Sequence, residues 1–393
     1  MRILHTADWH FGRTLEGRSR LTEQIAFMDE LVDIVNDQQI DLVLIAGDVY
    51  DSVNPPAAAE QLFYEGLSRL ADGGKRQVAV ISGNHDHPDR LAASAPLAAQ
   101  QGIRLVGLPV TDIQSIGIAR TGELAKIIML PYPSESRLKE LLSDAAEEEA
   151  LRSKYSERVA ALISRQAEHF EAGTVNLIMS HLYVLGGMET ESERPIQVGG
   201  AYTVDTSALC AGAQYTALGH LHRPQNVKAA SPIRYCGSPL AYSFSEAGQA
   251  KSVTVLDLVP GQEAVPQELF LRSGKPLVNW KAKEGVSQVH QWLEEGRDSS
   301  AWIDLEVHMT EAMSMEQIQS LRKSYDGFIH IRPVYPEMEQ VREAAPRSAM
   351  SMEEQFSRFY ARQTGGAQPE PELVRLFLEL LQENEAADQD AAG

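Results

Sequence analysis

Short apolar runs alternate with amphipathic runs over the first hundred residues, and no other feature of the sequence constrains the fold as strongly. Apolar runs at residues 2–7, 42–46 and 77–81 predict strands. Between them, apolar residues at helical spacing predict helices over residues 21–35 and 57–70. This βαβαβ order predicts an α/β fold with a parallel-type sheet and helices on its faces.

Further strands are predicted in the rest of the first 272 residues, at residues 103–106, 126–130, 175–180, 215–218 and 252–258. A charged, alanine-rich segment at residues 134–171 interrupts this series. Its composition favours helix and indicates a solvated helical pair on the surface.

The pattern changes after Leu271. Residues 275–333 predict the order strand, helix, strand, helix, strand, which describes a small α+β domain. Two helix signals follow a linker; the first opens with a capping box at Ser351 to Glu354, and the second carries an apolar stripe from Leu373 to Leu381. The predicted parts are a large domain at 1–272, the α+β domain at 273–336, a linker at 337–349, a helical segment at 350–384 and a disordered acidic tail at 385–393.

Composition limits the class of protein. The net charge of −20 argues against a surface coated in basic residues, although bound divalent cations supply positive charge locally. The two cysteines, Cys210 and Cys236, are too few for a disulfide framework and are typical of a reducing compartment. Because there is no secretory signal and no stretch of ~18 apolar residues, we expect a cytoplasmic protein without membrane contact.

Polar residues directly follow five of the predicted strands. They are Asp8–Trp9–His10, Gly47–Asp48, Gly83–Asn84–His85–Asp86, His181 and Gly219–His220–Leu221–His222. If the strands share one sheet, these turns meet at its carboxyl edge, where open α/β sheets bind ligands. The glycines before Asp48, Asn84 and His220 permit tight backbone turns.

The chemistry that uses such a set is binuclear metal hydrolysis. Two carboxylates, an amide and four imidazoles suffice for two divalent ions, with one carboxylate bridging them at the ~3.5–4 Å separation of two-metal sites. Mixed nitrogen and oxygen ligands suit Mn²⁺, Fe²⁺ or Zn²⁺ better than Ca²⁺ or Mg²⁺, and the lack of thiolates disfavours a structural zinc site. Each motif alone arises often by chance, but five in this order predict a metal centre.

Together the five motifs resemble the calcineurin-like metallophosphoesterase superfamily. The stretches from His5 to Gly12 and from Gly47 to Asp51 are similar to bacterial nuclease subunits of this superfamily, and the likeness continues through Tyr235 to Pro239 and into the C-terminal parts. The resemblance implies a β-sandwich flanked by helices, with a small α+β capping domain and a C-terminal helical segment.

The resemblance also implies a role for each residue. Asp8, His10 and His222 would hold one metal ion, Asn84, His181 and His220 the other, and Asp48 would bridge them. A shared water or hydroxide would attack the phosphorus, while His85 protonates the leaving oxygen or stabilises its charge and Asp86 orients the His85 ring. Asp51 stands near the place where archaeal and eukaryotic relatives carry a second histidine, and we do not count it as catalytic.

The implied activity is that of a DNA nuclease with two divalent ions, most simply Mn²⁺, in DNA end processing, repair, recombination and replication. It would act as an exonuclease on duplex ends and as an endonuclease on single strands and hairpins. The implied partner is an SbcC-type ATPase bound by residues 350–384, with homodimerisation through the helices at 21–35 or 57–70. DNA phosphates would contact surface arginines such as Arg13, Arg18, Arg20 and Arg90.

Two other classes stay open at this point. A phosphatase acting on small molecules or phosphoproteins is one, but such enzymes carry an arginine shortly after the Gly-Asp motif, and Asp48 is followed by Val49–Tyr50–Asp51–Ser52–Val53. A non-enzymatic scaffold that couples an ATPase to DNA is the other. It is disfavoured because every expected ligand position is filled.

Overall fold

The computed structural model describes residues 1–134, 155–193, 202–335, 356–357, 360, 369 and 373–377. Two compact units are present: Met1–Trp280 with Leu293–Leu305 and Arg322–His330, and Lys281–Trp292 with Glu306–Leu321 and Ile331–Gly393. Within the first unit lie two six-stranded sheets, which together position the polar turns.

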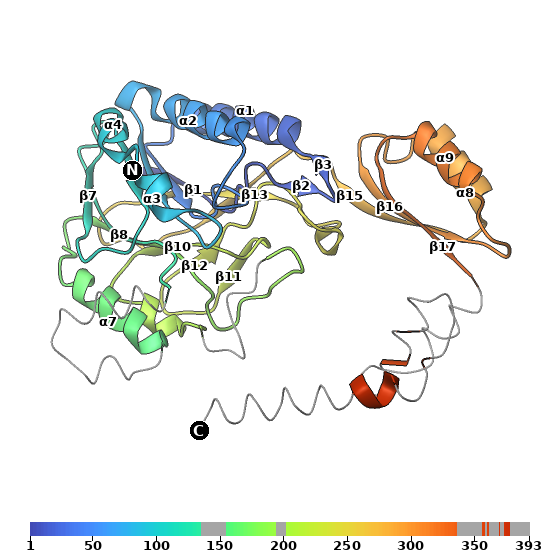
Figure 1. The fold of residues 1–393 in the computed structure, drawn as a ribbon. Helices are drawn as coiled ribbons and strands as arrows, with labels where there is room; N and C mark the ends of the chain where they lie inside the picture. The colour runs from blue at the N-terminus through green and yellow to red at the C-terminus, as the bar shows by residue number, and fades with distance from the viewer. Residues whose placement is uncertain are drawn as a thin grey trace. The chain divides into compact units, whose positions relative to one another are not determined.

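The first sheet has the strand order β14-β13-β1-β4-β5-β6 (Figure 1). Its bounds are Arg2–Thr6 for β1, Leu42–Ala46 for β4, Gln77–Ile81 for β5, Ile103–Val106 for β6, Ser252–Asp257 for β13 and Gln267–Phe270 for β14. Strands β1, β4, β5 and β6 are parallel, whereas β13 and β14 are antiparallel to their neighbours. The predicted parallel βαβαβ order is therefore confirmed for the first hundred residues.

The second sheet has the order β11-β12-β10-β9-β8-β7. Its bounds are Gln114–Gly117 for β7, Leu124–Leu130 for β8, Val175–His181 for β9, Tyr215–Gly219 for β10, Gln225–Val227 for β11 and Ile233–Tyr235 for β12. Since β9 and β10 lie here, the strands that carry the five polar motifs do not share one sheet. They come from two sheets, as the sandwich implied by the family resemblance requires.

The alternation of side chains along the strands explains the layers. Alternate residues of a strand face opposite sides of its sheet. On one side of the first sheet, Leu4, Ile45 and Val80 share a core with helices α1 (Leu21–Asp37) and α2 (Ala57–Ala71). On its other side, Ile3, Leu44 and Ile81 share a second core with residues of the second sheet, among them Ile127, Leu177 and Ala217.

A third core lies on the outer side of the second sheet, where helix α7 (Tyr155–Ala167) packs. The arrangement is therefore helix, sheet, sheet, helix. Val159 and Ile163 of α7 are fully buried, so the expectation of a solvated helical pair over residues 134–171 is wrong for this helix. The apolar stripe that made the segment amphipathic covers the sheet, and residues 135–154 lie outside the described residues.

The remaining elements of the first 272 residues are short. They are β2 (Thr14–Leu15), β3 (Arg18–Ser19), α3 (Pro88–Ala92), α4 (Ala95–Ala98) and the 3₁₀ turns Asp72–Gly74, Ala99–Gln101, Thr206–Leu209 and Phe244–Glu246. Helix α2 begins directly after Pro56 and ends at Ala71, and the next residue, Asp72, has a left-handed φ of 46°. The side chain of His87 accepts a hydrogen bond from the Arg90 N–H and caps α3.

The later part of the chain has the predicted order strand, helix, strand, helix, strand. The elements are β15 (Leu277–Ala282), α8 (Val286–Glu294), β16 (Trp302–His308), α9 (Met315–Ser324) and β17 (Phe328–Val334), and the strands form a sheet in the order β15-β16-β17. Leu373 to Phe377 are helical, and the Phe377 ring stacks on that of Phe356 at a centroid distance of 4.2 Å. Phe356, Ser357 and Tyr360 of the first helix signal are helical as well, whereas the linker and most other residues of the two signals lie outside the described residues.

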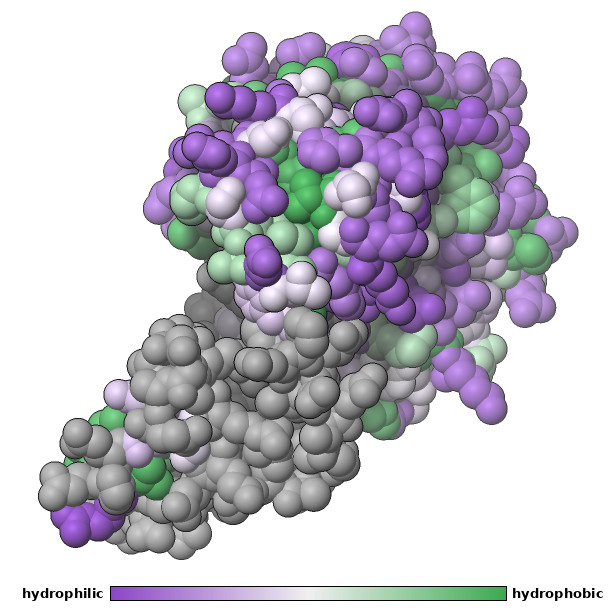
Figure 2. Space-filling view, turned by 90° about the vertical axis from the view of Figure 1, so that its right-hand side faces the viewer, coloured by the Kyte–Doolittle hydropathy of each residue, from purple (hydrophilic) through white to green (hydrophobic). Residues whose placement is uncertain are grey.

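Hydrophilic residues predominate on the face shown in Figure 2, and hydrophobic residues lie among them in small groups. The large apolar side chains that build the three cores are inside the molecule. Among the described residues, no helix is both long enough and apolar enough to span a membrane.

Candidate active site

The five polar turns meet at the carboxyl ends of the parallel strands, and backbone hydrogen bonds link them. The N–H of Asp8 donates to the carbonyl of Gly47 at 3.0 Å, and the N–H of His10 donates to the carbonyl of Asp48 at 3.0 Å. The N–H of His220, after β10 of the second sheet, donates to the carboxylate of Asp8 at 2.9 Å. Turns from both sheets are therefore held in fixed register.

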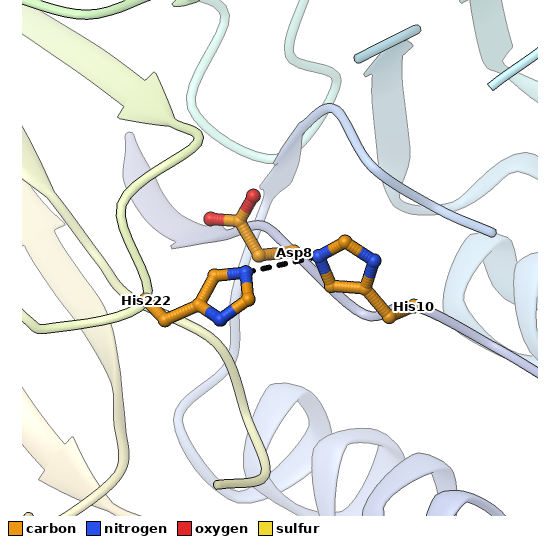
Figure 3. Close-up of side chains that lie close together, drawn as sticks. All are labelled: Asp8, His10 and His222. Atoms are coloured by element: carbon orange, nitrogen blue, oxygen red, sulfur yellow. Dashed lines mark hydrogen bonds between the residues drawn. The ribbon is translucent and has the colours of Figure 1, made fainter. Parts of the chain in front are cut away.

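One group of possible metal ligands consists of Asp8, His10 and His222, whose donor atoms all lie within 4.8 Å of one another. Figure 3 shows the two imidazoles facing each other beside the Asp8 carboxylate. The Nε2 atoms of His10 and His222 are 3.0 Å apart. All three side chains are almost completely buried, so their donor atoms converge on one small volume.

A second group contains Asp8, Asp48 and His181, again within 4.8 Å. Asn84 extends it, because its Oδ1 lies 3.0 Å from Nε2 of His181. One oxygen of Asp48 lies 3.4 Å from Nε2 of His181 and 3.7 Å from Nε2 of His10. The Asp48 carboxylate therefore faces both groups.

His220 completes the set of seven predicted metal ligands. Its ring centroid is 5.5 Å from that of His181, and its Nε2 is buried without a hydrogen-bond partner among the described residues. A buried polar atom without a partner is costly unless something binds it. Together with the surrounding carboxylate, amide and imidazole donors, this atom fits a divalent metal ion.

Neighbouring groups fix the orientation of two of the imidazoles. Nδ1 of His181 lies 2.9 Å from the carbonyl of Ala46 and donates its proton there, so Nε2 is the nitrogen that faces the metal site. Nδ1 of His222 lies 2.7 Å from Oγ of Ser192, and the backbone N–H of His222 donates to the carboxylate of Glu193. Ser192 and Glu193 escaped the sequence analysis because they follow no strand and match no ligand motif.

Burial and neighbouring charges together set the pKa values of the buried histidines. Burial lowers the pKa of His10 to about 3 and that of His220 well below its ordinary value, so both rings are neutral. Burial also acts to lower the pKa of His181, but the charges of Asp48 and Asp8 and the hydrogen bonds to Asp48 and to the Ala46 carbonyl together raise this pKa to about 9. For Asp48, burial acts to raise the pKa of the carboxyl, but the charge and hydrogen bond of His181, together with His10 and His85, lower this pKa. A metal ion requires neutral imidazoles, so His10 and His220 are ready to bind one, whereas a metal ion at His181 would displace the proton from its Nε2.

The backbone is strained at the ligand positions. Asp8, His10, Asp48 and His220 have φ values of 54°, 46°, 48° and 108°, and they are half of the eight non-glycine residues with positive φ in the described part of the chain. Such conformations cost roughly 1–3 kcal/mol each and persist where the surroundings enforce them. Their concentration here is the pattern of a functional site.

The three glycines before ligand residues serve two purposes. Gly47 has a φ of 91°, as expected for a tight turn. Gly83 and Gly219 do not have positive φ, but a Cβ on them would lie 2.0 Å from Oδ1 of Asp48 and 1.9 Å from the carbonyl oxygen of Ala46. At these two positions glycine is needed for close approach rather than for the turn that we predicted.

The structure places His85 in the site but gives its orienting contact to a different residue. Nε2 of His85 lies 4.0 Å from Asp48, and Nδ1 lies 2.8 Å from the backbone carbonyl of Asp51. Asp86, expected to orient this ring, instead accepts hydrogen bonds from the N–H groups of Val49, Tyr50 and Gly83. That expectation is corrected: Asp86 ties together the turns after β4 and β5, and burial raises its pKa to about 6.

Two residues without a predicted role also line the site. The carboxylate of Asp51 lies 3.5 Å from Nδ1 of His10. The ring of Tyr242 packs edge-on against His10 and His222 at centroid distances of 5.4 and 5.8 Å. Asp51 follows the predicted ligand Asp48 by three residues, so its position in the sequence indicates that it lies near the site. No motif near Tyr242 indicates this for Tyr242.

Of the four arginines expected to contact DNA, the structure excludes Arg20. Only 1% of its surface is exposed, and it pairs with Glu23 at 2.6 Å. Arg90 pairs with Glu60, and Arg13 donates to the carbonyl of Ser192. Arg20 was predicted from its residue type and its position in the sequence near the metal loops, and neither reveals that its side chain is buried.

Two family models match the chain. One, described as calcineurin-like phosphoesterase, covers residues 1–224, and one described as the type 5 capsule protein repressor C-terminal domain covers residues 273–364. The chain is 56% identical over 381 residues to the SbcD component of the SbcCD nuclease of Bacillus subtilis strain 168, a match that covers 97% of both chains. The chain belongs to the SbcD family of calcineurin-like phosphoesterases. It is also 36% identical over 304 residues to the SbcD protein of Rhodobacter capsulatus, over 72% of both chains.

Family membership confirms the predicted resemblance and the predicted fold class. The clustered aspartates and histidines are accordingly the dimetal site of an SbcD-type phosphoesterase. Among solved structures, GAP50, the anchor in the inner membrane complex of Plasmodium, is similar with a TM-score of 0.40 and 11% identity over 70% of this chain and 84% of its own. A dimetal phosphatase from Danio rerio has a TM-score of 0.39 and 14% identity, over 68% of this chain and 95% of its own. These two scores are too low to bear on function.

Proposed function

We propose that this SbcD-family chain is a Mn²⁺-dependent DNA phosphodiesterase that works with an SbcC-type ATPase in DNA end processing and repair. It acts as an exonuclease on duplex ends and as an endonuclease on single strands and hairpins. The observation that carries the proposal is the Asp48 carboxylate, which lies within 3.7 Å of histidine nitrogens from both ligand groups. The high identity to a component of a nuclease supports DNA as the substrate.

In this proposal the site holds two divalent ions. Asp8, His10 and His222 would hold one, Asn84, His181 and His220 would hold the other, and Asp48, whose carboxylate faces both groups, would contribute to both sites. The ions supply an activated water and offset the charge that develops on the phosphoryl oxygens. Nitrogen and oxygen donors without thiolates favour Mn²⁺ over Mg²⁺ or Ca²⁺.

His85 acts on the leaving group. Because its Nδ1–H donates to the carbonyl of Asp51, the neutral ring has only a lone pair at Nε2. The ring therefore gives a proton from Nε2 only when both ring nitrogens carry one, and Nε2 lies 4.0 Å from the carboxylate of Asp48. Asp86 is a positioning residue that holds the turn carrying Asn84 and His85 against the turn after β4.

The proposed partners are the ATPase, DNA and a second copy of this chain. Residues 350–384 bind the ATPase, and the helical residues Leu373 to Phe377 belong to that segment. Dimerisation would use α1 or α2. Most of their large apolar residues face the core, but Ile25 and Tyr64 are 44% and 38% exposed and offer a contact.

The direct test replaces His85 with leucine and measures cleavage of single-stranded and duplex DNA with Mn²⁺. We expect kcat to fall roughly 10²- to 10⁴-fold, the range for loss of a general acid, while bound metal is retained. His87→Leu is the matched control, because His87 is two residues away, exposed and outside the site. Equal activity of His85→Leu and the wild type would contradict the proposed role, and a wild type that binds metal but cleaves no DNA would contradict the function.

A further inference from the structure

A second concave site lies away from the metal ligands. It is a pocket of about 730 Å³ whose lining includes Arg18, Lys275, Trp302, Lys323 and Asp326. All of these residues belong to the same compact unit as the metal site. A pocket of this size accommodates a ligand as large as a nucleotide.

Positive charge predominates in the pocket, since it has three cationic side chains and one carboxylate. Arg18 donates to the backbone carbonyls of Asp326 and Phe328 at 2.9 and 3.3 Å, which orients the guanidinium without neutralising it. Within the described part of the chain, none of the three cations forms an ion pair with a carboxylate. In a chain with a net charge of −20, such a place attracts an anion.

Trp302 lines the pocket and is held by several contacts. Trp302 is 8% exposed, and Lys275 Nζ and Arg18 Cζ lie 4.5 and 5.9 Å from the centroid of its ring. The indole N–H donates to the buried Glu23 at 2.9 Å, and Glu23 also accepts from the backbone N–H of Lys275 at 2.7 Å. Cations held in this way lose little freedom when they bind a ligand.

The carboxylate of Glu23 also connects the pocket to the metal site. Glu23 pairs with Arg20, and Nη1 of Arg20 donates to the carbonyl of Ala241 at 2.9 Å. The next residue, Tyr242, packs against His10 and His222. The pocket and the metal ligands therefore share one continuous framework of buried contacts.

We infer that this pocket binds a phosphate group of the nucleic-acid substrate at a point away from the bond that is cleaved; this inference rests on the proposed function. A guanidinium and two ammonium groups match a phosphodiester anion, which accepts charge-assisted hydrogen bonds from each. This phosphate contact does not depend on the nucleotide sequence and sets only the position of the bound nucleic-acid strand.

The test uses the full-length chain with Mn²⁺ and the double variant Lys275→Ala/Lys323→Ala. For a single-stranded oligonucleotide we expect KM to rise roughly tenfold, the effect of losing charged hydrogen bonds, with kcat unchanged. The slope of log KM against log salt concentration should fall by about 0.7, the value for one phosphate of a single strand. Hydrolysis of bis(p-nitrophenyl) phosphate, which reaches the metals but not the pocket, should not change.

Lys75→Ala is the control, because the Lys75 side chain is 79% exposed and lies outside the pocket. If the wild type cleaves both substrates and the double variant has the same KM for the oligonucleotide, the inference is overturned while the proposed function stands. If the wild type cleaves bis(p-nitrophenyl) phosphate but not the oligonucleotide, the proposed nuclease function is contradicted, and the inference that rests on it is contradicted as well. Calorimetric binding of inorganic phosphate that is lost in the double variant, with an unchanged oligonucleotide KM, would assign the pocket to a small phosphate compound and overturn the inference.

Discussion

His181 and His222 each direct one ring nitrogen into the metal site because the other nitrogen has a partner outside it. The partners are the carbonyl of Ala46 and the hydroxyl of Ser192. Partners of this kind fix the tautomer and the direction of a ligand. At the scale of single residues, the site therefore depends on groups that are themselves neither acidic nor ligating.

Residue types after strands predicted seven ligands, and the structure brings their side chains together, because the carboxyl ends of parallel strands lie together in any fold of this class. The groups that orient the ligands and His85 were harder to predict. Whether Asp51 or Asp86 orients His85 depends on the path of the turn after β4, and residue order contains little information on that path. The contact of His85 is with a backbone carbonyl, which every residue possesses.

His5, on β1, gives a prediction for pH. Burial, assisted by the charge of Arg234, lowers its pKa to about 3 in the folded protein, against roughly 6.5 in an unfolded chain. Between these values the unfolded state binds more protons, so stability is intact above about pH 6.5 and falls by about 1.4 kcal/mol per pH unit below it.

The measurement is urea unfolding of the wild type and His5→Gln in the same chelating buffer at pH 7 and pH 5. The wild type should lose about 2 kcal/mol more than the variant on this change. All other titrating groups are common to both proteins and cancel. An equal loss would show that His5 is not held neutral by the fold.

At the scale of elements, the ends of β4 and β10 approach so closely that side chains are excluded between them. Strand β10 belongs to the second sheet and β4 to the first, and Gly219 lies against the carbonyl of Ala46. The carbonyl of Ala46 also accepts the hydrogen bond of His181. This contact therefore sets the distance between the sheets at the metal site.

Gly219→Ala should disturb the site more than an ordinary glycine substitution. The new Cβ would lie 1.9 Å from the carbonyl oxygen of Ala46, so one strand end must move, at a cost of roughly 1–3 kcal/mol. We expect a lower melting temperature and weaker metal binding. Gly117→Ala is the control, because nothing lies within 4 Å of a Cβ there; similar behaviour of the two variants would refute this view.

At the scale of the whole molecule, the element order was predictable and the division of strands between two sheets was not. The apolar runs of β9 and β10 look like those of β4 and β5, because all four strands are buried on both faces. Nothing in such a run says which sheet it joins. The sandwich came from family resemblance, whereas the residues alone suggested a single sheet.

The proposed assignment of nuclease activity to the large domain and of ATPase binding to the C-terminal segment gives a further prediction. Removing residues from Met350 onward should abolish co-purification with the ATPase, because the helical segment is lost, and should spare Mn²⁺-dependent nuclease activity. Removing only residues 385–393 should affect neither property. Co-purification that survives the longer deletion would contradict the proposed binding segment.

The central claim is that two metal ions share the Asp48 carboxylate between two sets of ligands. Anomalous diffraction at the manganese edge, from crystals grown with Mn²⁺, tests this claim most directly. We predict two manganese peaks per chain, with Asp48 in contact with both ions, His10 in contact with one and Asn84 in contact with the other. A single peak, or an Asn84 that contacts no metal, would contradict the account.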